Sequence, residues 1–198
     1  MREYNDEKIL EVLNTAEKVE KIKNLESEEV VIGDKSYIFE EMSFFDDGIR
    51  ILIPNNFIDM NEAYRKIKYP NEDRPKYIKC NNEGSICFTF KIIDSPLDND
   101  SVEELTKGMK DILKRVNPSM IFFDLKFFDV EDKKIGYFDF KSSVIDGFIY
   151  NVMYFFELNG KTVFGGFSCL YKEYEDWKLI VEEIIQKIKF ASEENISE

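Results

Sequence analysis

Apolar side chains recur at every third or fourth position in three segments of the chain, a spacing typical of amphipathic helices. One helix is predicted after Ser101-Val-Glu-Glu104, which has the spacing of a capping box, and it runs to Val116. A second is predicted over residues 173–189, around Trp177. The third is predicted over residues 6–24, with an apolar stripe that comprises Ile9, Val12, Leu13, Ala16, Val19 and Ile22.

Alternation of apolar and polar positions predicts strands in the remaining segments. A hairpin is expected around the turn sequence Asp46-Asp47-Gly48, and a short helix is expected to begin at Asp59. Asp146-Gly147 and Asn159-Gly160 have the composition of two-residue turns in which both residues take positive φ. The predicted strands are 36–40, 49–53, 77–80, 85–92 and a four-stranded meander at about 120–131, 134–145, 148–158 and 161–171.

The strands of the predicted meander carry bulky apolar side chains on both faces, so both faces have to be covered. Helices are the only predicted elements that can supply this cover. We therefore predict an α+β fold, a three-layer α/β/α sandwich with a largely antiparallel sheet and an added N-terminal helix. The expected division is a helix and linker at 1–30, an α/β/α domain at 31–191 and a polar tail at 192–198.

The chain contains no histidine. Catalysis by Ser-His-Asp, Cys-His or HExxH groups is therefore excluded, and carboxylate, Lys, Tyr or Cys chemistry remains. The three cysteines, Cys80, Cys87 and Cys169, have no CxxC spacing, so we expect reduced thiols and no metal site. We find no cofactor motif and expect no cofactor and no enzymatic activity.

Charge and hydropathy restrict the partners. The net charge of −13 should repel nucleic acid and anionic lipid, so neither is expected to bind. No apolar run reaches the length of a membrane span, and residues 1–7 lack the apolar region of a signal peptide. We therefore expect a cytoplasmic protein without membrane insertion.

Two further sequence features, an acidic loop and a pair of glycines, have a structural explanation that we favour over a functional one. The acidic loop formed by Asp94 and Asp98-Asn-Asp100 offers oxygen ligands for calcium, but it lacks the EF-hand pattern and is better explained by turn capping. Gly165-Gly166 lies inside a predicted strand without a phosphate-loop pattern, and it indicates a bulge or the close packing of a helix.

The best candidate site is the segment 64–79, which is basic and rich in tyrosine within an acidic chain. Six cations against two acids give it a local charge of +4. It is either a solvated loop or a site for an acidic peptide or an anion, since Arg and Tyr are favoured anchors at interfaces. The candidate partner- or ligand-binding residues are Tyr64, Arg65, Lys68, Tyr69, Arg74, Lys76 and Tyr77.

The order of elements also resembles a known fold. It is carried by Ile51-Leu-Ile-Pro-Asn-Asn-Phe57, by Lys68-Tyr-Pro70 and Arg74-Pro75, by the strand Ser85-Ile-Cys-Phe-Thr-Phe90, and by the capped helix, the meander turns and the Trp177 helix. Over roughly residues 36–190 this pattern resembles the PsbP-like α/β/α sandwich superfamily. The resemblance implies binding rather than catalysis, because members of that superfamily serve as subunits, adaptors and chaperones.

Two hypotheses about function follow. The first is a non-catalytic cytosolic protein-binding module, such as an adaptor or a secretion-type chaperone, with a protein partner or as a homodimer. In it, the stripe on helix 6–24 packs on its own domain or on a partner. The alternative is a small-anion or small-ligand binding protein, or a carboxylate-dependent hydrolase, with a cleft near residues 64–79.

Overall fold

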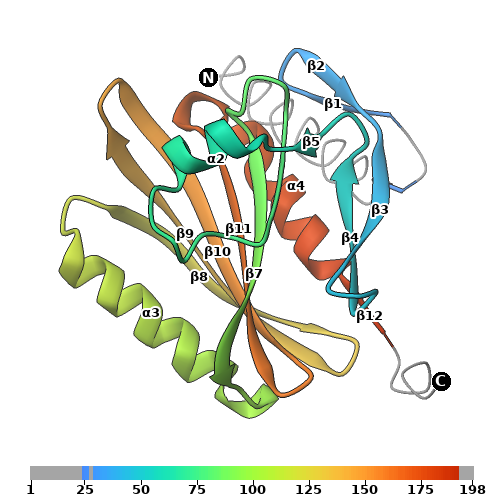
Figure 1. The fold of residues 1–198 in the computed structure, drawn as a ribbon, viewed down its shortest axis with the longest axis vertical. Helices are drawn as coiled ribbons and strands as arrows, with labels where there is room; N and C mark the ends of the chain where they lie inside the picture. The colour runs from blue at the N-terminus through green and yellow to red at the C-terminus, as the bar shows by residue number, and fades with distance from the viewer. Residues whose placement is uncertain (1–23, 27–28, 192–198) are drawn as a thin grey trace, which may run out of the picture.

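The computed structural model describes residues 24–26 and 29–191, and the predicted helix with Ile9, Val12, Leu13, Ala16 and Val19 lies outside them. Seven strands form an antiparallel sheet in the order β5-β6-β7-β11-β10-β9-β8 (Figure 1). Their bounds are β5 Ile58–Asp59, β6 Tyr77–Cys80, β7 Cys87–Pro96, β8 Ile121–Val130, β9 Lys133–Val144, β10 Gly147–Leu158 and β11 Lys161–Leu170. The four-stranded meander expected from the alternating pattern is therefore present.

A smaller sheet packs beside the main one, with β4 (Ile49–Pro54) between β3 (Phe39–Phe44) and β12 (Lys189–Phe190). The β3–β4 turn is as predicted, and its tight bend gives Phe45, Asp46 and Asp47 positive φ. The strand expected at 36–40 is divided in two. Residues Lys35–Tyr37 form β2, which pairs with β1 (Val30–Ile32) in a separate hairpin.

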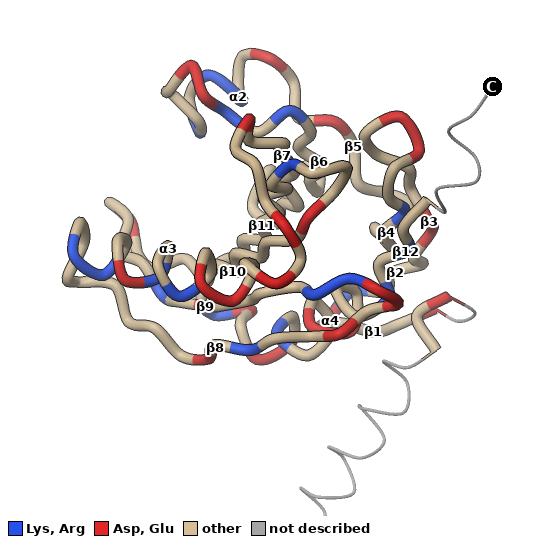
Figure 2. The backbone as a smooth tube through the Cα atoms, turned by 90° about the horizontal axis from the view of Figure 1, so that it is seen from below, with Lys and Arg blue, Asp and Glu red and all other residues tan. Residues whose placement is uncertain are grey.

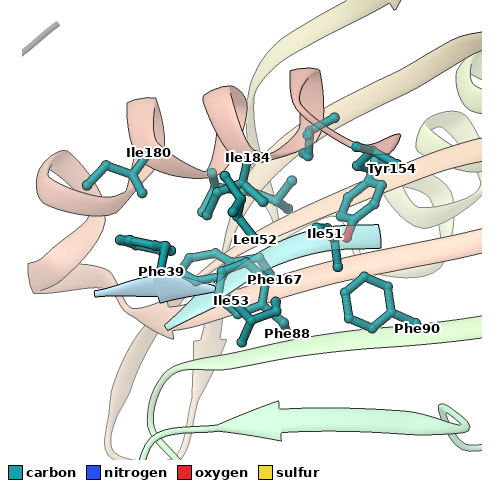
Figure 3. Packing of buried hydrophobic residues seen from close by; sticks show 14 of the residues in the cluster. Phe39, Ile51, Leu52, Ile53, Phe88, Phe90, Tyr154, Phe167, Ile180 and Ile184 are labelled. Atoms are coloured by element: carbon teal, nitrogen blue, oxygen red, sulfur yellow. The ribbon is translucent and has the colours of Figure 1, made fainter. Parts of the chain in front are cut away.

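The main sheet is covered on both faces, as its apolar pattern predicts. Helix α4 (Tyr174–Gln186) and the smaller sheet cover one face, where Ile51, Phe88 and Ile184 are almost fully buried (Figure 3). Helix α3 (Val102–Val116) covers part of the other face and packs on Phe138 and Phe155. The fold is the predicted α+β three-layer sandwich with a largely antiparallel sheet.

Helix α3 packs closely on Gly136 of β9. A Cβ atom at this glycine would lie 1.9 Å from Oγ1 of Thr106 on α3. The prediction of a bulge at Gly165-Gly166 is wrong, because the β10–β11 register is continuous there, and among the described residues the atoms nearest to a Cβ at either glycine belong to β7 and β10 and not to a helix. Gly165 instead accommodates the ring of Tyr154 on β10, which a Cβ would approach to 2.1 Å.

One helix start and one turn differ from the prediction, and a second turn agrees with it. Helix α2 (Glu62–Lys68) begins after Asn61, whose side chain accepts a hydrogen bond from the Tyr64 amide, and not at Asp59. The Asn159-Gly160 turn has positive φ at both residues, as expected. In the turn that contains Asp146-Gly147, Gly147 has positive φ and Asp146 does not. Gly147 pairs with Val144 in the β9–β10 ladder, so it belongs to the strand and not to the turn between the strands.

Candidate functional site

Helix α3 leaves β7 and β11 uncovered, and here the chain from Lys68 to Pro75 forms a second wall above the sheet. Figure 2 shows α2 and α3 standing apart on the same side of the main sheet. A pocket of about 370 Å³ lies against the Lys68–Pro75 wall. Its floor is formed by β7, β10 and β11, and we call it the sheet pocket. The floor residues are Thr89, Asn151, Val152, Met153, Phe164, Gly166, Phe167 and Ser168.

Strand register explains which side chains form this floor. Asn151 lies opposite Ser168, and Met153 lies opposite Gly166, so these four residues share one face of the sheet. Gly166 keeps the floor low, because a Cβ there would approach Oγ1 of Thr89 to 2.7 Å. Met153 also packs in the apolar cluster beneath α3, so the pocket borders that layer.

The cations of the candidate segment mainly hold the wall in place. Arg65 donates hydrogen bonds to the carbonyl oxygens of Pro75 and Lys76. Arg74 donates to the Asn71 carbonyl at 3.1 Å and lies 3.7 Å from a Glu62 carboxylate oxygen. Since both guanidinium groups serve contacts within the segment and with α2, they rigidify the wall.

The local charge of +4 is partly balanced by two acids that lie outside residues 64–79. Lys79 pairs with Asp59 at 3.0 Å, and Lys66 lies 3.6 Å from Glu62. The ammonium of Lys76 lies 5.0 Å from the centre of the Tyr77 ring. A sequence window cannot reveal this balance, because Asp59 and Glu62 approach the segment only through the β5–β6 pairing and the α2 turn.

The structure brings together three of the seven candidate residues, Lys68, Tyr69 and Arg74, in the wall of the sheet pocket. Tyr69 is half-buried, and burial, followed by the nearby cysteine sulfurs, raises the pKa of its hydroxyl. Tyr77 points to the opposite face, where its ring lies 5.2 Å from that of Phe44. Tyr64 is 64% exposed on α2, away from the pocket.

Apolar side chains also gather at the strand ends beyond the pocket. Ile145 at the β9–β10 turn is fully exposed, and Phe148 is about half exposed. Leu170 follows Ser168 on the same face of β11, so it continues the pocket floor, whereas Phe148 and Ile121 lie on the opposite face of the sheet with Tyr150. We call this set of strand ends the apolar edge; its residues are Ile121, Val144, Ile145, Phe148 and Leu170.

Sequence reasoning missed the pocket floor. Its signal was the presence of small and polar residues, Asn151, Gly166 and Ser168, on strands that are otherwise apolar. The face that these residues share becomes clear only when the pairing of β10 with β11 is known.

Sequence reasoning also missed a buried ionic network between α4 and the sheet. Asp139 is fully buried and accepts hydrogen bonds from the Tyr150 hydroxyl at 2.9 Å and the Asp124 amide at 2.6 Å. Its other partner is the ammonium of Lys178 on α4, at 3.3 Å. The available signal was an acid at a core-facing position of a strand, between Tyr137 and Lys141.

The network continues to the surface and joins the helix to β8. Lys178 lies 2.7 Å from Asp124, and Lys126 bridges Asp124 and Glu182. Burial lowers the pKa of Lys178, but the hydrogen bond to Asp124 and the charge of Asp139 outweigh it, so the pKa is raised. Lys178 therefore stays charged at neutral pH, and the network serves as an electrostatic link between layers.

The acidic loop has the structural role that was favoured for it. The Asp98 carboxylate accepts the Ser101 amide at 3.0 Å, and the Asn99 side chain accepts the Lys134 amide at 2.6 Å. Within residues 24–26 and 29–191, no group of three Cys, Asp or Glu side chains is placed to hold a metal ion. In the same ranges, no helix has the length and hydropathy needed to cross a bilayer.

Comparison with solved structures identifies the fold. Cyanobacterial PsbP (CyanoP) from Synechocystis superposes with a TM-score of 0.57 and 11% identity, over 82% of this chain and 98% of that one. LpqN of Mycobacterium tuberculosis, a protein involved in cell envelope biogenesis, gives a TM-score of 0.52 and 11% identity over 81% and 95%. The described domain is an α+β sandwich with a pocket on its open sheet face.

This sandwich has the fold of the PsbP-like superfamily, as the sequence pattern indicated. A Bacteroides thetaiotaomicron protein is similar too, with a TM-score of 0.52 and 7% identity, and the match covers 79% of this chain and 50% of that one. No model of a protein family matches the sequence, and comparison with curated proteins gives no match. At these identities the likeness concerns the fold alone.

Proposed function

We propose that the chain is a non-catalytic, cytoplasmic protein-binding module that receives an apolar side chain of a partner in the sheet pocket. The observation that carries the proposal is the sheet face left open by α3, where the pocket floor continues into the exposed Leu170 of the apolar edge. Exposed apolar surface that is contiguous and rimmed by polar residues is typical of interaction sites. An adaptor or a secretion-type chaperone would use such a surface.

Pairing within segment 64–79 supports an apolar partner over an acidic one. Arg65, Arg74 and Lys79 already have partners in the domain, so recognition of an anion would have to replace those contacts. The pocket floor presents the side chains of Met153 and Phe164 instead. Burial of apolar groups in a central pocket, with a polar rim, is the usual source of affinity at such interfaces.

The lining also favours binding over hydrolysis. Among the residues that line the sheet pocket, Asp73 is the one carboxylate, and Lys91 pairs with it. A carboxylate-dependent hydrolase requires two carboxyl groups in different environments close to the substrate. We therefore propose that the chain is not an enzyme.

A pocket-filling variant tests the proposal. Ser168→Trp places a large ring on the pocket floor, whereas Ile67→Trp adds the same ring at a position that is 78% exposed on α2. Wild type and both variants are used as bait in native lysate, with circular dichroism as the control for folding. We expect a partner that wild type and I67W retain and that S168W loses; identical partners for all three proteins would refute the proposal.

A second copy of the chain is one form that the partner can take. Light scattering of the purified protein and of S168W distinguishes this case. A dimer of the wild type that S168W dissociates would identify the partner as a copy of the chain.

The pocket volume favours one other function, the binding of a small apolar ligand. About 370 Å³ lies in the lower part of the range of roughly 300–1,000 Å³ that small-molecule sites occupy. Native mass spectrometry of the purified protein tests it. A bound mass that is present with the wild type and I67W but missing from S168W would favour the ligand, and an unliganded mass for all three would exclude it under those conditions.

A further inference from the structure

Two of the three cysteines are direct neighbours across strands. Cys80 on β6 lies opposite Cys87 on β7, and the two side chains point to the same face of the sheet. The pairing places them together although the sequence contains no CxxC motif.

The pair occupies a site at which the strands come closest. The Met60 amide donates to the Ile78 carbonyl, so the backbone N–H and C=O groups of Ile78 point toward β5 and away from β7. Those of Cys80, two residues later on the same strand, point the same way. The Asn81 amide donates to the Ile86 carbonyl, one ladder step beyond. Cys80 and Cys87 are therefore a non-hydrogen-bonded pair, with Cα atoms about 4.5 Å apart. This separation lies within the range of roughly 4.4–6.8 Å that a disulfide spans.

The ammonium group of Lys68 lies next to the sulfur of Cys87. The Lys68 ammonium lies 3.0 Å from Sγ of Cys87 and donates to the Gly84 carbonyl at 2.9 Å. Lys68 thus offers a charged partner to the thiolate of Cys87, the form in which a thiol is nucleophilic. Burial, followed by the charge of Cys87, raises the pKa of Cys80 to about 11, so Cys80 is a protonated thiol at neutral pH.

We propose that Cys80 and Cys87 form a reversible dithiol–disulfide site, with Lys68 as the cation that favours attack by Cys87. The site lies beside the sheet pocket, because Lys68 and Tyr69 line the pocket and contact or adjoin the pair. The proposal concerns the thiols themselves and does not depend on what the pocket binds. The class of oxidant that it requires is a peroxide.

The reaction balances in two steps. The Cys87 thiolate attacks one oxygen of hydrogen peroxide, the O–O bond breaks, and hydroxide leaves and is protonated to water. Cys87 is then a sulfenic acid. The sulfur of Cys80 attacks that of Cys87, the S–S bond forms, and the hydroxyl group leaves with the Cys80 proton as a second water. Two electrons pass from the two sulfurs to the peroxide, and a dithiol reductant returns them.

Trypsin makes the test direct, because cleavage after Lys79 and Lys91 yields one peptide, 80–91, with both thiols. The folded protein is treated with hydrogen peroxide, unfolded, alkylated with iodoacetamide, digested and measured by mass spectrometry. We expect peptide 80–91 to lose two hydrogens and both alkyl groups after peroxide, and to regain both alkyl groups after dithiothreitol.

Cys169 supplies the matched control. Like Cys87 it is fully buried, but it lies on the opposite face of the sheet, in the apolar core, where burial raises the pKa of its thiol, so its peptide should keep its alkyl group throughout. Lys68→Gln should slow the loss of alkylation several-fold, and Cys80→Ser should abolish the loss of two hydrogens. Full alkylation of peptide 80–91 in the peroxide-treated wild type, or linkage only between chains, would overturn the proposal. So would equal reaction rates for the wild type and K68Q.

Discussion

Replacement of Gly136 by alanine should push helix α3 off the sheet. The added Cβ would lie 1.9 Å from Oγ1 and 2.8 Å from Cβ of Thr106. The oxygen would have to retreat by about 1.5 Å to reach the 3.4 Å at which ordinary contact begins. Thr106 is fully buried and its hydroxyl donates to the Val102 carbonyl at 2.7 Å, so rotation of the side chain would break that bond.

The expected cost follows from these contacts. Overpacking of this kind costs about 1–3 kcal/mol, and a lost buried hydrogen bond adds about 1 kcal/mol. Alanine returns about 0.5–1 kcal/mol, because it is less flexible than glycine in the unfolded chain. We therefore expect G136A to lower the free energy of unfolding by about 2 kcal/mol, measured by urea denaturation with a fixed m-value.

Helix α3 offers a matched control of opposite sign. Outside its own helical turn, no described residue has an atom within 4 Å of the position that a Cβ of residue 108 would take, so Gly108→Ala should raise the free energy of unfolding by up to about 1 kcal/mol through helix propensity. Thr106→Ala added to G136A should recover part of the loss, since it removes the oxygen but not the Cβ. A G136A protein as stable as the wild type would refute the reasoning, as would full additivity of the two substitutions.

Three further predictions concern charge and capping. Asp139→Asn should lower the free energy of unfolding by about 3 kcal/mol in urea denaturation, because it removes one partner of a buried pair with Lys178; an effect below about 1 kcal/mol would contradict this. The hydrogen bond from Lys178 lowers the pKa of Asp124, so this carboxylate stabilises the fold above about pH 4, and the stabilisation is lost as the pH falls further. Asp124→Asn should therefore make the free energy of unfolding depend less on pH in the acid range. Asp98→Ala should cost about 1 kcal/mol and Ser101→Ala almost nothing in thermal unfolding, since Asp98 makes the side-chain cap bond and Ser101 makes none; equal losses would reverse this assignment.

The fold followed from periodicity, because each predicted layer has its own apolar stripe. The α4 stripe around Trp177 and the two-faced meander required cover on both sides, and the structure supplies it. The N-cap of α3 was predicted wrongly, because the side chains of Asp98 and Ser101 are both suitable acceptors and lie three residues apart. Ser101 has the sequence pattern of an N-cap residue. In the structure, the Asp98 side chain accepts a hydrogen bond from the Ser101 amide, and a turn of 3₁₀ helix, Asn99–Ser101, precedes α3.

The candidate site was only partly accessible to sequence reasoning. Composition located the wall, because Lys68, Tyr69 and Arg74 stand out in an acidic chain. Apart from Thr89 on β7, the floor comes from strands about 80–100 residues further along, so only the register of β10 and β11 reveals it. Charge counting overstated the free positive surface, since pairing with Asp59 and Glu62 depends on tertiary contact.

The smaller sheet has a consequence for synthesis of the chain. Its central strand β4 pairs on one side with β3, a few residues away, and on the other with β12, where Lys189 lies opposite Arg50. Long-range pairing of this kind forms slowly, and an unpaired strand edge is a site for wrong association. While the ribosome adds the residues between β4 and β12, the β3–β4 hairpin has one open edge. We expect a nascent chain stalled before Lys189 to need a chaperone, whereas one released after Ala191 can close the sheet by itself.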